Sequence, residues 1–321
     1  MRLTGLAVGA QVPAGDFAGR IEEVHARAVL VAVAGGGWMT LLAADLGRQP
    51  FGVTFAAPEG FSFRPLVAAG AEVAARAGVM RVGAGALAID LREAPPWRCG
   101  LDRLRLDLSH PAVTRAYQTA GAMLAADGRS DGLRRSAAAT LDRLAEATRR
   151  RDAAAAEQAM ARLVGFGEGR TPAGDDYLVG YFAALWACAE TRVGFAAVLG
   201  PRLAALAAQT ERLSRLYLQA AAAGEVSESI AAVAAGVAAG NDDSAIRRIV
   251  AAALAVGHSS GAAAVLGLLQ GSAACARPPA QACVAVAASS VFRRPRHALL
   301  PRAPGAHRRT LRPSRRCRPA P

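Results

Sequence analysis

A glycine-rich stretch in the second half of the chain places the strongest constraint on the fold: Gly165-Phe-Gly-Glu-Gly-Arg-Thr-Pro-Ala-Gly-Asp-Asp176. Its first glycines occupy every second position, so the backbone is free to adopt positive φ and to approach a ligand closely. Thr171 and Pro172 stand where the N-cap and first turn of a helix are expected, and a long apolar run follows. Asp175 and Asp176 then fall near that first turn, where the helix dipole favours negative charge. The stretch predicts a loop that opens a buried helix and sets two carboxylates beside free backbone N–H groups.

The rest of the chain divides into a β-like part and a helical part. Short apolar runs at 28–33 and 38–43 flank Gly35-Gly-Gly37, and runs at 79–82 and 86–91 flank Gly83-Ala-Gly85; both patterns predict hairpins. From about residue 108, alanine- and leucine-rich segments with helical periodicity take over, among them one expected helix from 203 to 223. We therefore predict an α+β protein with a β-rich domain over 1–107 and a helical domain over 108–290.

The net charge of +13 is concentrated at one end of the chain. Ten arginines and no acidic residue lie in the stretch 291–321, so most of the net charge belongs to that tail. The tail is rich in arginine and proline and shows no apolar periodicity, which predicts disorder. An unselected chain end explains it better than a binding surface, because no basic face precedes it. Nucleic acid is therefore not expected as a partner.

A second glycine turn, Gly257-His-Ser-Ser-Gly261, joins two expected helices. Ser259 or Ser260 is suited to cap the following helix, and His258 is suited to be a general acid/base or a ligand donor. The alternative is that His258 is a buried histidine hydrogen-bonded between helices. Two such turns in one helical region could form the two halves of a pocket.

A third stretch places three hydroxyls on one helix face, because Thr210, Ser214 and Tyr217 are separated by four and three residues. Arg212 and Arg215 nearby are candidates for binding a carboxylate. An ordinary solvated helix face explains all of these residues equally well.

Several classes of site do not fit the sequence. The glycine loop lacks the Gly-Lys-Ser/Thr of a P-loop, and its flanks are helical rather than the strands of a dinucleotide fold. The five cysteines are scattered without metal-ligand spacing, which favours a reducing cytoplasm and no disulfide framework. The stretch 249–276 carries no formal charge and is long enough to cross a bilayer, but the polar turn at its middle favours two buried helices. We expect a cytoplasmic protein without a membrane span.

Together these motifs resemble a bacterial domain-of-unknown-function family that includes the AllH-type subunit of oxamate carbamoyltransferase, from anaerobic allantoin breakdown. The family pattern Gly-Leu-Gly-Pro-Gly-Leu-Thr-Pro-Ser-Gly-Asp-Asp is similar to Gly165–Asp176, and the family's second motif is similar to Gly257–Gly261. The segment Leu41–Gly52 looks like its N-terminal motif, so the resemblance spans roughly residues 24–271. The sequence departs from the family at several positions, among them Arg170 in place of an apolar residue, Ala173 in place of a serine and Ala263 in place of an acid.

The resemblance implies a carbamoyltransferase-like complex whose other subunits are the partners of this chain, together with a small anionic metabolite. The alternative is a non-catalytic structural or regulatory partner of a metabolic enzyme. For the first case we expect the catalytic residues to be Asp175, Asp176 and His258, with Asp175 and Asp176 also able to place Mg²⁺, the one cofactor considered. The expected substrate-binding residues are Gly167, Gly169, Thr171, Gly174, Ser259, Ser260 and Gly261.

Overall fold

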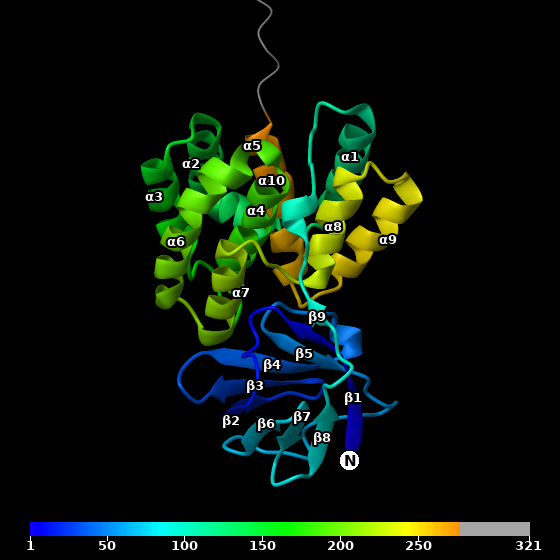
Figure 1. Ribbon diagram of the computed structural model, residues 1–321. Helices are drawn as coiled ribbons and strands as arrows, with labels where there is room; N and C mark the ends of the chain where they lie inside the picture. Colours follow the sequence, from blue (N-terminus) through cyan, green and yellow to red (C-terminus); the bar gives the residue numbers. More distant parts are fainter. Residues whose placement is uncertain (277–321) are drawn as a thin grey trace, which may run out of the picture. The chain divides into compact units, whose positions relative to one another are not determined.

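The computed structural model describes residues 1–276 of the chain, with strands in the N-terminal part and helices in the C-terminal part (Figure 1). This confirms the predicted α+β class. The boundaries predicted at 107 and 290 stay predictions, and the tail predicted over 291–321 lies outside the described residues.

The N-terminal strands form a sheet that closes on itself. Their order is β5-β4-β3-β2-β6-β7-β8-β1-β9, and an additional pairing between β1 and β5 closes the ring. Large apolar side chains fill the interior, among them Met39, Phe55 and Phe63, each with no exposed surface. The strands are β1 (Arg2–Gly9), β2 (Phe17–Val24), β3 (Ala28–Val33), β4 (Trp38–Ala43), β5 (Gly52–Phe55), β6 (Glu72–Arg76), β7 (Val79–Val82), β8 (Leu87–Asp90) and β9 (Pro96–Trp97).

Both predicted hairpins are confirmed. Antiparallel β3 and β4 are joined across Gly35–Gly37, where all three glycines have φ between 91° and 107°. Antiparallel β7 and β8 are joined across Gly83–Gly85, where the two glycines have φ of 63° and 87°. Residues with a Cβ rarely adopt positive φ, which is why glycine occupies these turns.

The C-terminal part is a bundle of helices. They are α1 (Pro111–Asp127), α2 (Asp131–Arg150), α3 (Ala153–Leu163), α4 (Ala173–Ala187), α5 (Ala189–Thr191), α6 (Ala197–Leu206), α7 (Arg212–Ala222), α8 (Glu228–Ala238), α9 (Asp243–Leu254) and α10 (Ser260–Cys275). Shorter turns are η1 (Ala44–Leu46), η2 (Leu101–Arg103), η3 (Arg192–Ala196) and η4 (Ala207–Gln209).

The single helix predicted over 203–223 is wrong. After α6 and η4, Thr210 takes an extended conformation with φ −120° and ψ 176°, so α7 starts anew at Arg212. The break turns the Thr210 hydroxyl toward the carboxylate of Asp175, as described below.

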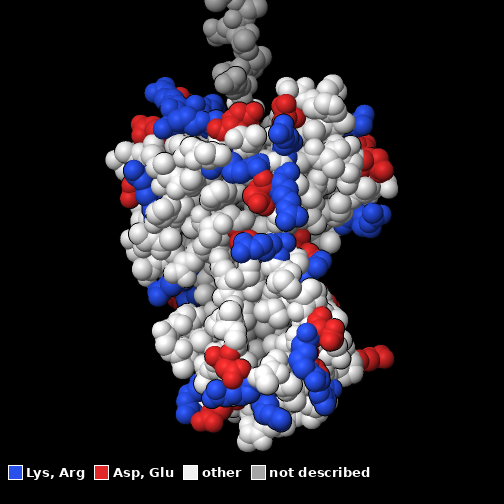
Figure 2. Space-filling view, in the orientation of Figure 1, with Lys and Arg blue, Asp and Glu red and all other residues white. Residues whose placement is uncertain are grey.

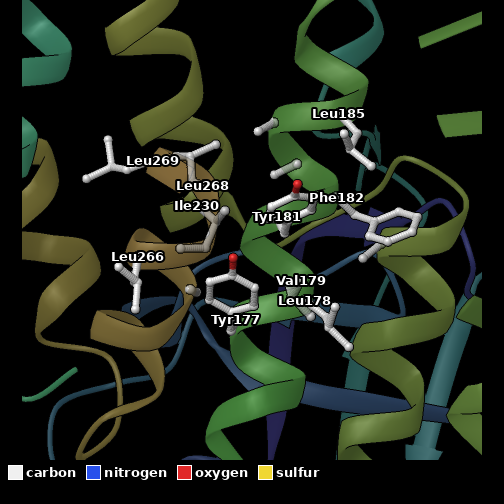
Figure 3. Packing of buried hydrophobic residues seen from close by; sticks show 14 of the residues in the cluster. Tyr177, Leu178, Val179, Tyr181, Phe182, Leu185, Ile230, Leu266, Leu268 and Leu269 are labelled. Atoms are coloured by element: carbon white, nitrogen blue, oxygen red, sulfur yellow. The ribbon is translucent and has the colours of Figure 1, made fainter. Parts of the chain in front are cut away.

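Helices α4 and α10 pack against each other at the centre of the bundle. A Cβ on Gly180 of α4 would lie 1.8 Å from the carbonyl oxygen of Ala264, and one on Gly267 of α10 would lie 1.9 Å from that of Tyr177. Figure 3 shows the Tyr177 side chain on the side of α4 that faces α10, and the Tyr177 hydroxyl donates to Gln270 of α10 over 2.8 Å. Only glycine permits this approach, so these positions fix the relative placement of the two helices.

The strands and the helices also contact each other. Leu30 and Phe51 of the β-rich part form a small buried cluster with Leu216 and Ala220 of α7. Ion pairs add to this contact, including Arg48 with Glu228 and Arg212 with Glu22. On the face shown in Figure 2, basic and acidic groups lie close to one another, so no single-sign patch covers it.

Within residues 1–276, no single helix is long and apolar enough to cross a membrane, although the bent pair Ala173–Ala187 and Ala189–Gln209 passes the same length and composition test. Within that pair, nearly all of α4 is buried. The three cysteines in this part of the chain, Cys99, Cys188 and Cys275, are unpaired.

Candidate functional site

The glycine loop folds back onto the start of α4. Gly165, Gly167 and Gly169 have φ of 73°, 113° and 90°. The N–H of Gly174 donates to the carbonyl of Phe166 over 2.8 Å, and a Cβ on Gly174 would lie 2.1 Å from the carbonyl oxygen of Leu163. The glycines therefore permit the positive φ of the turns and the close contact between the loop and the start of α4. The N–H groups of Gly167 and Gly169 donate to no acceptor among the described residues.

Asp175 is the anchor of this loop. Its side chain is fully buried; Oδ1 accepts the N–H of Gly165 over 2.8 Å, and Oδ2 accepts the hydroxyls of Thr210 over 2.5 Å and Ser214 over 2.6 Å. The predicted helix face with three hydroxyls is not formed, because Thr210 lies in the extended break before α7 and Tyr217 packs against Phe51. The hydroxyls of Thr210 and Ser214 nevertheless meet at a carboxylate of the protein itself. Both oxygens of Asp175 are occupied by protein donors.

Thr171 does not cap α4, contrary to the sequence prediction. The helix begins at Ala173, its N-cap is Pro172, and no side chain caps it. The Thr171 hydroxyl instead forms a hydrogen bond of 2.9 Å with the hydroxyl of Ser260. Capping of α10 by Ser259 or Ser260 is also not seen, since Ser259 is its N-cap residue without a side-chain bond. The hydroxyls of the two glycine turns therefore pair with each other.

Asp176 lies beside this hydroxyl pair. Its side chain is 9% exposed, and Oδ2 is buried without a hydrogen-bond partner among the described residues. Burial raises the pKa of Asp176 to about 7; the hydroxyls of Ser260 and Thr171 oppose this rise, and the negative charge of Asp175 adds to it. A buried carboxyl that titrates near neutral pH is typical of functional sites.

The second glycine turn is held in place by backbone contacts. Gly257 has a φ of 63°, and a Cβ on Gly261 would lie 2.0 Å from the carbonyl oxygen of Ala253. His258 is exposed, so the alternative of a buried histidine is wrong, and its backbone carbonyl accepts from Arg129 over 3.0 Å. Ala263, where the family pattern has an acid, is buried in α10.

A cavity of about 930 Å³ opens next to the glycine loop. The side chains of Arg212 and Arg215 line it, so the cationic candidates named from the sequence do border a cavity. Two further wall residues, Glu23 and Trp38, come from β2 and β4, and no sequence motif marked them. The remaining lining residues are Gly165, Gly167, Gly169, Pro172, Ala208, Gln209, Thr210 and Glu211.

The geometry supports a metal site less than it supports an anion site. Among residues 1–276, no group of three or more His, Cys, Asp or Glu side chains is arranged to hold a metal ion. Asp175 already accepts three protein hydrogen bonds, whereas Oδ2 of Asp176 is buried without a partner among the described residues. The Mg²⁺ role predicted for Asp175 and Asp176 stays a prediction.

The part of the chain that builds these two turns matches a family model. Residues 163–272 match the family described as oxamate carbamoyltransferase subunit AllH. The matched residues include both glycine turns, all of α4 and α10 as far as Ser272, which confirms the resemblance to the AllH-type family over this part of the chain. The likeness of Leu41–Gly52 to an AllH-type motif lies outside the match and stays a prediction. The chain matches no curated protein and no solved structure.

Proposed function

We propose that this chain is a cytoplasmic subunit of an oxamate carbamoyltransferase-type complex and that it binds a small anionic metabolite where its two glycine turns meet. The observation that carries the proposal is the hydrogen bond between Thr171 and Ser260 beside the unpartnered Oδ2 of Asp176. It supports one site built from two motifs that both lie within the AllH-type match.

The residues of the two turns suit a carbamoyl compound. Such a ligand carries oxygens that accept hydrogen bonds and an amide-like nitrogen that donates them. The free N–H groups of Gly167 and Gly169 would hold its oxygens, while Asp176 would accept from its nitrogen or, when protonated, donate to an oxygen. Ser260 would switch its hydroxyl from Thr171 to the ligand.

The three residues predicted to be catalytic, Asp175, Asp176 and His258, would have different roles. Asp176 is suited to carry a proton because its pKa of about 7 lets both protonation states coexist near neutral pH. Asp175 would act by holding the loop, since its oxygens are already occupied. His258 is exposed on the turn, where it is accessible to ligand or to another subunit.

Ligand-induced thermal stabilisation tests this placement. Carbamoyl phosphate or oxalurate should raise the melting temperature of the wild-type chain, and the shift should be lost in Asp176→Ala and Asp176→Asn. Asp142→Asn, which changes an exposed acid on α2, is the matched control and should keep the shift. An unchanged shift in both Asp176 variants would overturn the placement.

The same experiment separates the alternative of a non-catalytic structural or regulatory partner. If the turns only pack helices, neither anion raises the melting temperature of the wild-type chain, and a partner protein co-purifies with it nonetheless. A shift that requires Asp176 supports the binding role.

A further inference from the structure

The cavity beside the glycine loop has walls from two parts of the chain. The loop, η4 and α7 form one side, and Glu23 and Trp38 of the β-rich part form the other. We infer that this cavity is a composite oxyanion site in which Arg215 holds the ligand's carboxylate or phosphate group and the β-rich part supplies the opposite wall. The inference deepens the proposed function and rests on it for the identity of the ligand.

Arg215 has the properties of an anion anchor. It lines the cavity, and its Nε is buried with no acceptor among the described residues. Its one hydrogen bond in this part of the chain runs from Nη2 to the carbonyl of Ala208 over 3.0 Å. A guanidinium presents five N–H donors in a rigid fork that matches carboxylate and phosphate oxygens, so most of its binding capacity is free.

Two other arginines near the cavity, unlike Arg215, form ion pairs with acidic residues. Arg212 pairs with Glu22 over 3.0 Å and lies 4.5 Å from the ring centre of Trp38, and Arg170 pairs with Glu23. These partners neutralise the two arginines and connect α7 and the loop to β2.

Glu211 is another charged residue that lines the cavity. It is exposed, so water screens its charge far more than that of the partly buried Arg215. Within residues 1–276, Arg215 is thus the cavity cation that has no acidic partner.

The β-rich wall adds a role for residues that the family match does not include. Trp38 covers the guanidinium of Arg212 and borders the same space as Arg215, whereas the matched residues start at 163. Ligand selection would then depend on β2 and β4 as well as on the two glycine turns.

Binding measurements on the full chain test this inference, with oxamate and inorganic phosphate as probes. We expect at least one probe to bind saturably by calorimetry and to change the tryptophan fluorescence. Arg215→Met should weaken that binding by at least tenfold, because it removes charge-assisted hydrogen bonds to a bound anion. Arg202→Met is the matched control: Arg202 pairs with Glu157 away from the cavity, so its loss should leave the affinity unchanged.

A second variant locates the probe. In Trp38→Phe the fluorescence change should disappear while calorimetric binding persists, because Trp97 and Trp186 do not line this cavity. A response that persists in Trp38→Phe would contradict the β-rich wall. Whichever probe depends on Arg215 identifies the anion as a carboxylate or a phosphate.

Two outcomes would overturn the inference: no saturable binding of either probe, or equal affinity in the wild type and in a folded Arg215→Met variant. Failure of the proposed function is distinguishable from both. If oxamate binding requires Arg215 but Asp176→Asn keeps the thermal shift with carbamoyl phosphate and oxalurate, the oxyanion site is supported. The proposed ligand position beside Asp176 is then contradicted.

Discussion

The hydroxyl of Thr171 lies 2.9 Å from the hydroxyl of Ser260, although 89 residues separate them in the chain. The contact exists because α4 and α10 start next to each other and pack along their length. A loop at the start of one central helix and a turn at the start of the other thus become one site, with Asp176 beside it.

The hydroxyl pair should be measurable as a coupling energy. In a double-mutant cycle with Thr171→Val and Ser260→Ala, we expect the two variants together to destabilise the protein by about 1 kcal/mol less than the sum of the single variants, the usual net value of one hydrogen bond. Urea unfolding of the four proteins gives this number. Additivity within error would show that the two hydroxyls do not interact.

Asp175→Ala should be strongly destabilising, because it leaves Gly165, Thr210 and Ser214 without their buried acceptor. We expect a loss of about 2–3 kcal/mol in the free energy of unfolding, because the buried Ser214 hydroxyl is left without an acceptor, which costs about 1–3 kcal/mol, and the half-buried Thr210 loses a hydrogen bond to a charged group. Denaturant unfolding checks the value against Asp142→Asn, which should change stability by less than about 0.5 kcal/mol. A small effect of Asp175→Ala would mean that the loop is not held by this carboxylate.

Asp176 should make stability depend on pH. Its pKa is raised from 3.8 to about 7 by burial, so the folded protein holds the proton more tightly than the unfolded chain. The resulting contribution to stability is fully present below pH about 4 and is lost as the pH rises through about 7. Each unit of difference between the pKa values in the folded and unfolded states corresponds to about 1.4 kcal/mol of stability.

The measurement is the free energy of unfolding from pH 4 to pH 8 in the wild type and in Asp176→Asn. Between these limits the wild type should lose about 4 kcal/mol more than the variant, which cannot ionise at this position. Parallel curves for the two proteins would show that Asp176 titrates normally.

The close packing of α4 and α10 predicts opposite effects for two glycines. Gly180→Ala should destabilise the protein severely, because its Cβ would lie 1.8 Å from the carbonyl oxygen of Ala264. Gly121→Ala in α1 meets no atom within 4 Å and should stabilise by up to about 1 kcal/mol through helix propensity. Thermal unfolding of both variants checks the contrast, and similar melting temperatures would contradict the packing.

Local signals in the sequence were sufficient for much of the fold. The glycine turns at Gly35–Gly37 and Gly83–Gly85 specify hairpins because positive φ favours glycine there. The break at Thr210 was not predictable in the same way. Leucine and alanine continue on both sides of it, and the turn is stabilised by a hydrogen bond to Asp175, which is remote in sequence.

The strand β1 was also missed, although its residues alternate between exposed and buried over Arg2–Gly9. Its place in the sheet depends on pairing with β5, β8 and β9, all far along the chain, and local patterns do not specify such partners. The closure of the sheet was therefore beyond what the sequence could show.

For the site, the motifs identified the residues but not their partners. The glycines and acids of the loop indicated a special structure, and the spacing of Thr210 and Ser214 indicated a shared face. That Thr210 instead lies in a break before α7 and binds Asp175 together with Ser214, and that Thr171 pairs with Ser260 instead of capping α4, depends on how the helices pack. Trp38 carried no signal at all, since an apolar strand residue has the same appearance whether or not it borders a cavity.

The most direct test of the site is a crystal structure of the full chain grown with oxalurate. We expect the ligand within hydrogen-bond distance of the N–H groups of Gly167 and Gly169 and of the Ser260 hydroxyl, with Asp176 facing its nitrogen. Oxalurate bound elsewhere, or two unoccupied glycine turns at saturating ligand, would contradict a single site built from the two turns.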